Sequence, residues 1–133
     1  MAGLVLNNLN LKPGQCIGIK GVVPKDAKSF AINLGKDSSN YVLHLNPRFD
    51  REGDINTIVC NSKEADVWGE EQRESTFPFQ QGETMEVCIS FDKSEIKVKL
   101  SGDHELKFPN RLSVDKVDYL EVDCLQIKGL KFD

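Results

Sequence analysis

The chain has 133 residues, 39% of them hydrophobic and 29% charged, with 17 Lys and Arg against 21 Asp and Glu. This length fits one domain spanning residues 1–133, and a formal net charge of −4 lacks the basic surface that nucleic-acid binding requires. No apolar run is long enough to cross a bilayer, and the first residues lack the basic segment of a signal peptide. We therefore expect no nucleic-acid partner and no membrane insertion.

Alternation of apolar and polar residues predicts β-strands along the whole chain. In the first clear run, residues 28–34, the side chains of Phe30, Ile32 and Leu34 share one face. Similar runs follow, with turn residues between them, at residues 41–49, 55–61, 87–91 and 94–100, and then in a run that has Leu106 and Phe108 on one face. The last three indicate two consecutive hairpins. Short turn intervals fit about ten strands, so we predict an all-β, antiparallel sandwich without a substantial helix.

The sequence leaves alternatives open for the secondary structure of residues 114–120 and for the oxidation state of the cysteines. Val114, Val117 and Leu120 also fit a helical period, over too short a window to decide. Four cysteines, at positions 16, 60, 88 and 124, contain no CxxC pair, which argues against a zinc or redox motif. Two disulfides could form, but without an export signal we expect reduced thiols. No metal ligand spacing surrounds either histidine, so we expect no metal and no cofactor.

The run at residues 41–49 carries unusual residues on its outer face. Tyr41, Leu43, Leu45 and Phe49 are predicted to face the core, while the alternate side chains of His44, Asn46 and Arg48 form a row. Neighbouring side chains in this row lie ~7 Å apart along a strand, so the row spans a length that matches one or two sugar rings. Because Pro47 cannot donate to a ladder, the strand should end or run along an edge there. The alternative is an ordinary solvated sheet face.

Further polar residues follow this row. Asn61 lies on the outer face of the 55–61 run, and Trp68 is the only tryptophan. A lone tryptophan is usually a core residue, but Trp68 stands in an acidic, glycine-containing segment, which makes a partly exposed ring plausible. Glu71 and Arg73 share one face of any strand here, and the alternative to a binding role is a surface ion pair of little energetic value.

The sequence His44-x-Asn46-x-Arg48, then Asn61, then Trp68-x-x-Glu71-x-Arg73, resembles the carbohydrate-recognition signature of the galectins. The resemblance covers essentially the whole chain and is greatest for single-domain, prototype members. It implies a two-sheet jelly-roll sandwich that binds β-galactosides such as lactose and N-acetyllactosamine. The three strand residues would bind the axial 4-hydroxyl of galactose, Asn61 the 6-hydroxyl, and Glu71 the neighbouring sugar. The indole of Trp68 would cover the apolar face of the ring.

The resemblance also suggests a second-sugar subsite and a dimer interface. The second sugar would lie near a set of four residues: Ser29, Arg51, Glu52 and Asp54. Glu52 stands where several close relatives carry histidine, which affects the preference for the second sugar. Apolar residues near both termini would pair across a two-fold axis: Leu4, Val5, Leu6, Leu130 and Phe132. Alternatively, these residues close the domain's own core.

The expected function is therefore a non-catalytic, cross-linking lectin that acts as a non-covalent homodimer on galactose-terminated glycans of glycoproteins and glycolipids. Such a protein would occur in the cytoplasm and outside the cell, exported without a signal peptide. Two alternatives remain. The chain could be an intracellular protein-interaction module. A glycoside hydrolase is less favoured, because hydrolysis needs one carboxyl with a raised pKa, and Glu71 stands between arginines.

Overall fold

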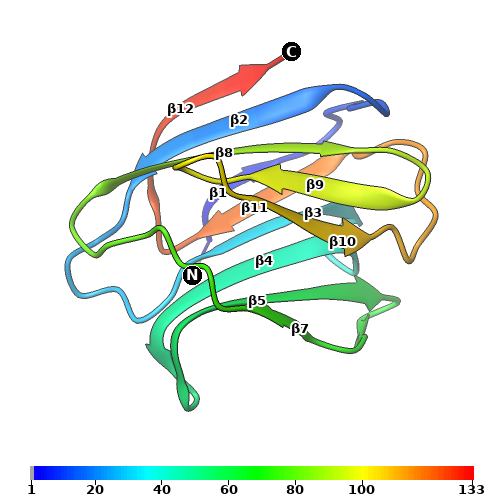
Figure 1. Ribbon diagram of the computed structural model, residues 1–133. Helices are drawn as coiled ribbons and strands as arrows, with labels where there is room; N and C mark the ends of the chain where they lie inside the picture. The colour runs from blue at the N-terminus through cyan, green and yellow to red at the C-terminus, as the bar shows by residue number, and fades with distance from the viewer. Residues whose placement is uncertain (1) are drawn as a thin grey trace.

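The computed structural model describes residues 2–133, and these form two antiparallel sheets packed face to face. The larger sheet has the strand order β1-β11-β3-β4-β5-β6, with β7 also pairing with β5. The smaller sheet has the order β10-β9-β8-β2-β12. Figure 1 shows the two layers, with the smaller sheet above the larger one. The predicted all-β sandwich is confirmed.

Twelve strands make up the described part of the chain. The seven-stranded sheet contains β1 (Ala2–Leu6), β3 (Ala31–Asp37), β4 (Asn40–Arg51), β5 (Asp54–Glu64), β6 (Val67–Trp68), β7 (Gln72–Glu74) and β11 (Tyr119–Asp123). The five-stranded sheet contains β2 (Cys16–Val22), β8 (Thr84–Phe91), β9 (Glu95–Lys99), β10 (Glu105–Pro109) and β12 (Gln126–Phe132). Residues 114–120, which also fitted a helical period, form a loop, an isolated bridge at Val117 and the start of β11. Within residues 2–133, no helix is long and apolar enough to span a membrane.

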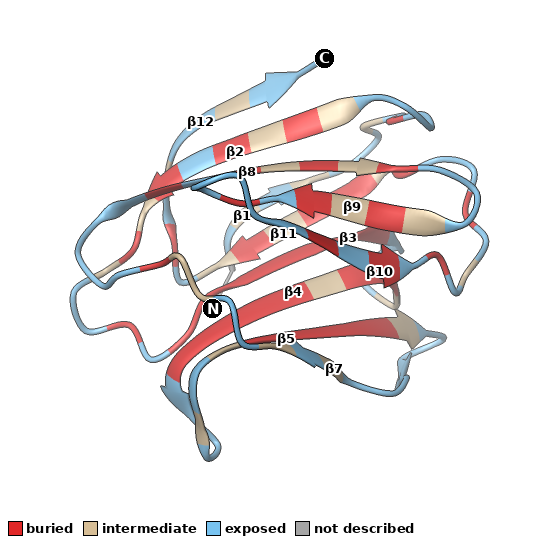
Figure 2. Cartoon of the chain, in the orientation of Figure 1, coloured by how far each residue is buried: buried red, intermediate tan, exposed pale blue. Residues whose placement is uncertain are grey.

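The core lies between the sheets and is built from alternate residues of nearly every strand, as Figure 2 shows by the buried bands on both layers. Phe30 and Phe108 are almost fully buried, and Ile96 and Val98 face inward from β9 as the alternation predicts. The rings of Phe30 and Phe79 pack edge to face with centroids 5.2 Å apart. Burial of these large side chains is the main favourable contribution to folding. It also fixes which face of β4 points away from the core.

Two expectations for the strand at residues 41–49 are corrected. A register irregularity between Tyr41 and His44 places both Val42 and Leu43 in the core. Tyr41 is buried, but outside this core, because its ring packs against Trp68 and its hydroxyl donates to Glu121 at 2.7 Å. The strand also neither ends nor lies at an edge at Pro47, since β4 runs on to Arg51 between β3 and β5.

The expectation of reduced thiols is wrong for two of the four cysteines. Cys16 on β2 and Cys88 on β8 form a disulfide, with Cα atoms 6.3 Å apart. These strands are neighbours in the five-stranded sheet, and this separation is within the range that a disulfide can bridge. Cys60 is a free, buried thiol whose pKa is raised to about 12 by burial and by the nearby charge of Glu74. Cys124 is free and exposed.

Candidate functional site

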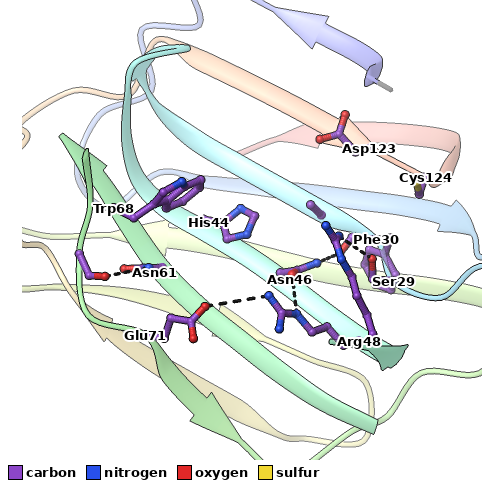
Figure 3. A pocket seen from close by; sticks show the side chains of 13 residues that line it. Ser29, Phe30, His44, Asn46, Arg48, Asn61, Trp68, Glu71, Asp123 and Cys124 are labelled. Carbon is purple, nitrogen blue, oxygen red and sulfur yellow. Dashed lines mark hydrogen bonds and ion pairs between the residues drawn. The ribbon is translucent and has the colours of Figure 1, made fainter. Parts of the chain in front are cut away.

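The predicted polar residues meet in one groove on the outer face of the seven-stranded sheet. The groove encloses about 600 Å³, and six of the seven signature residues line it: His44, Asn46, Arg48, Asn61, Trp68 and Glu71. Figure 3 shows the β4 side chains in a row, with Trp68, Asn61 and Glu71 on one side of it. Arg73 on β7 does not line the groove and instead contacts Asp54 and Glu71, as described below.

His44 is held as a neutral hydrogen-bond acceptor. Its Nδ1 lies 2.6 Å from Oδ1 of Asn33 on β3, and an amide oxygen can only accept, so Nδ1 carries the proton. The pKa of His44 is lowered to about 4, first by burial and then by the positive charges of Arg48 and Arg51. At neutral pH the other ring nitrogen, Nε2, therefore carries a lone pair. Asn33 was on the outer face in the predicted pattern but was not recognised as functional, because only strand pairing places it opposite His44.

Asn46 is held in one orientation by both ends of its amide. Its Nδ2 donates to the carbonyl of Phe30 at 2.8 Å, and its Oδ1 accepts from Nε of Arg48 at 2.9 Å. The Phe30 carbonyl is open to Asn46 because its ladder partner is Pro47. The amide of Phe30 donates to the Pro47 carbonyl, but Pro47 has no N–H to return that bond. One N–H of the Asn46 amide is left over, and Asn46 is only 2% exposed.

Arg48 is held by carboxylates at its other end. Its Nη1 donates to Oδ2 of Asp54 at 2.8 Å and lies 3.5 Å from Glu52, while its Nη2 lies 4.0 Å from Glu71. Arg73 donates two hydrogen bonds of 3.1 Å each to Asp54, and its Nη2 forms an ion pair with Glu71 at 3.0 Å. Hydrogen bonds from Arg73 and Arg48 keep the pKa of Asp54 below its usual value. Asp54 thus remains ionised and fixes both guanidinium groups.

Trp68 is 48% exposed, which agrees with the prediction of a partly exposed ring. Its centroid lies 4.8 Å from that of His44 and 6.0 Å from that of Tyr41, and the ammonium of Lys63 lies 5.2 Å from it. One edge of the indole is therefore packed, and the rest is open to the groove. Contact with other rings limits the motion of an otherwise exposed side chain.

Asn61 faces the groove beside Trp68 and is anchored to the neighbouring segment. It pairs with His44 across the strands, and its Nδ2 donates to the carbonyl of Gly69 at 3.0 Å. A Cβ atom on Gly69 would lie 2.9 Å from Oγ of Ser62 and 3.0 Å from Nη1 of Arg111, so a side chain at this position would displace these two polar groups. Arg111 also donates to the Glu70 carbonyl at 2.9 Å. The motif alone did not single out Arg111, which lies far away in sequence.

The four residues grouped as a second-sugar subsite lie around the β4–β5 turn, but their side chains form two separate sets of contacts. Asp54 and Glu52 contact Arg48, at the end of the groove where Glu71 lies. Ser29 accepts a hydrogen bond of 3.1 Å from Nη1 of Arg51, and these two line the groove with Ala31. Ser29 forms a bridge with Arg48 on the β3 side of β4, whereas Asp54 belongs to β5 on the opposite side. Arg51 and Asp54 are ladder partners at the two ends of the β4–β5 turn, where φ is 50° at Glu52 and 85° at Gly53, but their side chains contact different residues.

Comparison with known proteins gives the same picture over nearly the whole chain. A family model described as galactoside-binding lectin matches residues 4–132. Pig galectin-1 is 59% identical over 132 residues, covering 98% of each chain. A toad ovary galectin in complex with N-acetylgalactose has a TM-score of 0.96 and 50% identity, with 98% of both chains covered. A homodimeric agglutinin from chicken liver, CG-16, has a TM-score of 0.94 and 53% identity over 98% of both chains. The chain belongs to the galectins, the family of galactoside-binding lectins.

Proposed function

We propose that this protein is a β-galactoside-binding lectin whose groove on the β4 face holds a terminal galactose. The family and the similar toad galectin, which is in complex with N-acetylgalactose, support this function. The arrangement of donors and acceptors in the groove supports the choice of residues. The binding residues in this proposal are those of the signature, with Arg73 acting through Asp54 and Glu71.

The main support for the proposal is the combination of one acceptor and several donors in the β4 row of His44, Asn46 and Arg48. A single hydroxyl group that both donates and accepts hydrogen bonds fits this combination. His44 offers only a lone pair, whereas Asn46 and Arg48 offer only N–H groups. An axial 4-hydroxyl would donate to His44 Nε2 and accept from the other two. The equatorial 4-hydroxyl of glucose would leave these buried groups without partners, which costs about 1–3 kcal/mol per group.

Trp68 and Asn61 complete the galactose subsite. The axial hydroxyl leaves a continuous patch of C–H groups on one face of the ring, and the exposed indole of Trp68 provides a flat apolar partner for it. Asn61, fixed on the Gly69 carbonyl, has a remaining N–H for the 6-hydroxyl. The next sugar would then lie toward Glu71, with Glu52 and Asp54 beyond it.

Titration with lactose tests the function directly. We expect isothermal titration calorimetry to show saturable heat in the range of micromolar to millimolar lactose, because an open, hydrated groove binds small sugars weakly. Emission from Trp68, the only tryptophan, should change with the same dissociation constant. Sucrose is the matched control and should alter neither signal. No heat at millimolar lactose would contradict the proposal.

Binding should be insensitive to pH until His44 gains a proton. Its pKa of about 4 in the folded protein lies below the ordinary value of 6.5. We therefore expect the affinity for lactose to stay constant from pH 8 to about pH 5 and to fall below that. Between pH 6.5 and 4 the unfolded chain binds a proton that the folded chain excludes, so the free energy of unfolding should decrease with falling pH, by on the order of 2 kcal/mol.

Calorimetry and urea unfolding between pH 8 and 4 measure the two effects separately. His104 is exposed and lies outside the groove. A His104→Asn variant is therefore the control, and it should keep both pH profiles. A loss of affinity with a midpoint near pH 6.5 would show that His44 titrates normally and does not act as a protected acceptor.

The dimer proposal rests on two adjacent edge strands. β1 ends the seven-stranded sheet and β12 ends the five-stranded sheet, and the two strands contact each other. Leu4, Leu6 and Leu130 pack partly against the core, but Val5 and Phe132 are 44% and 49% exposed. Unpaired apolar edges favour association, and the similar chicken agglutinin is homodimeric. Measuring the molar mass of the protein in solution tests whether it is a dimer.

A dimer would carry two galactose sites and could cross-link glycoproteins and glycolipids that display lactose or N-acetyllactosamine units. Export without a signal peptide would bring the protein to such glycans outside the cell, besides a cytoplasmic pool. Catalysis is not part of this proposal. The carboxylates at the groove are paired with arginines, and the lowered pKa of Asp54 makes it a poor proton donor.

A further inference from the structure

Trp68 projects into the groove from a very short strand. β6 contains only Val67 and Trp68, which pair with Glu64 and Lys63 of β5. Both side chains are exposed and lie outside the core cluster, so burial in the core does not hold the indole. An exposed side chain that is ordered only when a ligand binds loses conformational freedom at that moment, which weakens association. The apolar wall of the groove therefore depends on the contacts that fix the indole beforehand.

Two side chains beside the indole do not themselves line the groove: Tyr41 and Lys63. Lys63 pairs with Tyr41 on one side and with Trp68 on the other, so the three side chains form one row across β4, β5 and β6. The Tyr41 ring meets the indole edge to face, with centroids 6.0 Å apart. The ammonium of Lys63 lies 4.1 Å from the centroid of the Tyr41 ring and 5.2 Å from that of the indole. These contacts favour one orientation of the indole.

Tyr41 is in turn fixed from the side of β11. Its hydroxyl donates a hydrogen bond of 2.7 Å to Oε1 of Glu121, and the hydroxyl of Tyr119 donates to the same oxygen at 3.1 Å. The two phenol rings stack, with centroids 6.3 Å apart and planes inclined by 13°. Burial and the hydrogen bond to Glu121 raise the pKa of Tyr41, so its hydroxyl keeps its proton and remains a donor. Tyr41 is therefore a rigid neighbour for the indole.

Gly35 allows the two tyrosine rings to meet. It lies on β3, between β4 and β11, and is the ladder partner of both Tyr41 and Tyr119. Cα atoms two strands apart are separated by ~10 Å, so the rings reach each other only by leaning over β3, where Gly35 has no side chain. A Cβ atom on Gly35 would also collide with the carbonyl oxygen of Asn40 and lie 2.8 Å from Cα of Tyr41. Contacts thus continue from β11 over β3 to the indole.

We infer that Tyr41, anchored by Glu121, is a positioning residue that fixes the indole of Trp68 for contact with galactose. Neither Tyr41 nor Glu121 lines the groove, so both act through Trp68. The indole is ordered before the sugar arrives, and the affinity is higher for that reason. This inference rests on the proposed function, because the gain concerns bound galactose.

A double-mutant cycle with Trp68 tests the inference, with lactose affinity measured by nuclear magnetic resonance titration. We expect Tyr41→Leu to raise the dissociation constant about 3–10-fold, the usual cost of ordering one side chain on binding. In the Trp68→Ala background the same substitution should change it by less than about 1.5-fold, because no indole remains to be positioned. Tyr41→Phe keeps the ring but loses the bond to Glu121, so its affinity should lie between those of the unmodified protein and Tyr41→Leu.

Emission from Trp68, the only tryptophan, gives a second readout in the absence of sugar. Its anisotropy should fall in Tyr41→Leu, where the indole moves independently of the sandwich, and fall less in Tyr41→Phe and Glu121→Gln. A role of Tyr41 in stability alone would lower the free energy of unfolding in urea without this change. Glu86→Gln removes the same charge as Glu121→Gln from an exposed position on the other sheet, and should keep the affinity and anisotropy of the unmodified protein.

The outcomes separate this inference from the proposed function. Equal losses of affinity from Tyr41→Leu with and without the indole overturn the inference, as does an unchanged affinity or anisotropy in that variant, and each leaves the lectin intact. If Tyr41→Leu does not fold, Tyr41→Phe and Glu121→Gln decide. Reduced affinity and anisotropy in both support the inference, and normal values in either overturn it. Absence of lactose binding by the unmodified protein overturns the proposed function and the inference together.

Discussion

Replacing Arg48 with alanine is expected to weaken lactose binding by about 100-fold or more. Arg48 lies almost fully buried beneath the groove and would donate charge-assisted hydrogen bonds to the galactose ring. Such bonds contribute about 1.5–3 kcal/mol each, so the loss of two accounts for this factor. The substitution also removes the donor to Asn46 Oδ1, which frees that amide to rotate. Calorimetry with lactose measures the change, and far-UV circular dichroism shows whether the sandwich is intact.

The Arg48→Lys variant separates charge from geometry. Lysine keeps the positive charge but cannot contact Asn46, Asp54 and the sugar at once with a planar fork. We expect it to bind lactose at least about tenfold more weakly than the unmodified protein, and more tightly than Arg48→Ala. A dissociation constant within about threefold of the original for the alanine variant would show that galactose does not bind on the β4 row.

Replacing Trp68 with alanine is expected to weaken lactose binding by roughly 10–100-fold. The indole is half exposed and contacts the rings of His44 and Tyr41, so its loss removes the apolar wall of the groove. Burial of an aromatic face together with ring contacts contributes about 1.5–3 kcal/mol. The free energy of unfolding should change little, since Trp68 lies outside the core cluster.

A Trp68→Phe variant is the matched comparison for this effect. Phenylalanine retains a flat ring of smaller area and should recover part of the lost affinity. Because neither variant contains tryptophan, calorimetry replaces emission as the readout. Unchanged affinity in Trp68→Ala would place the sugar elsewhere, and a large loss of stability would indicate that the ring serves the fold instead.

The strands of the core could be predicted because alternation records directly which face is buried. The 94–100 run is the clearest case, with Ile96 and Val98 inside and Lys99 exposed. The same reasoning placed His44, Asn46 and Arg48 on one outer face. It failed at Tyr41, where one extra residue in the ladder reverses the side to which preceding side chains point. A β-bulge within a short apolar run does not change the alternation of apolar and polar residues, so it cannot be predicted from that alternation.

Contacts between distant segments were the other part that the sequence could not supply. Asn33, Arg111 and the Cys16–Cys88 disulfide each depend on which strands become neighbours. Asp54 was grouped with a second-sugar subsite because it follows Arg51 and Glu52 in sequence. Only the β5–β7 pairing shows that Arg73 reaches it. Continuation of β4 beyond Pro47 depends similarly on β5, which pairs with it through Arg51.

The missing N–H of Pro47 has a consequence for the energetics of recognition. Its absence lets the Phe30 carbonyl immobilise the Asn46 amide when the chain folds. The rotational freedom of that amide is therefore already lost before any ligand arrives, and association does not have to order it again. In a shallow groove that makes few contacts, rigidity established beforehand counts for more than it would in a deep pocket. A residue usually regarded as incompatible with an inner strand would thus prepare the proposed site to distinguish one epimer from another.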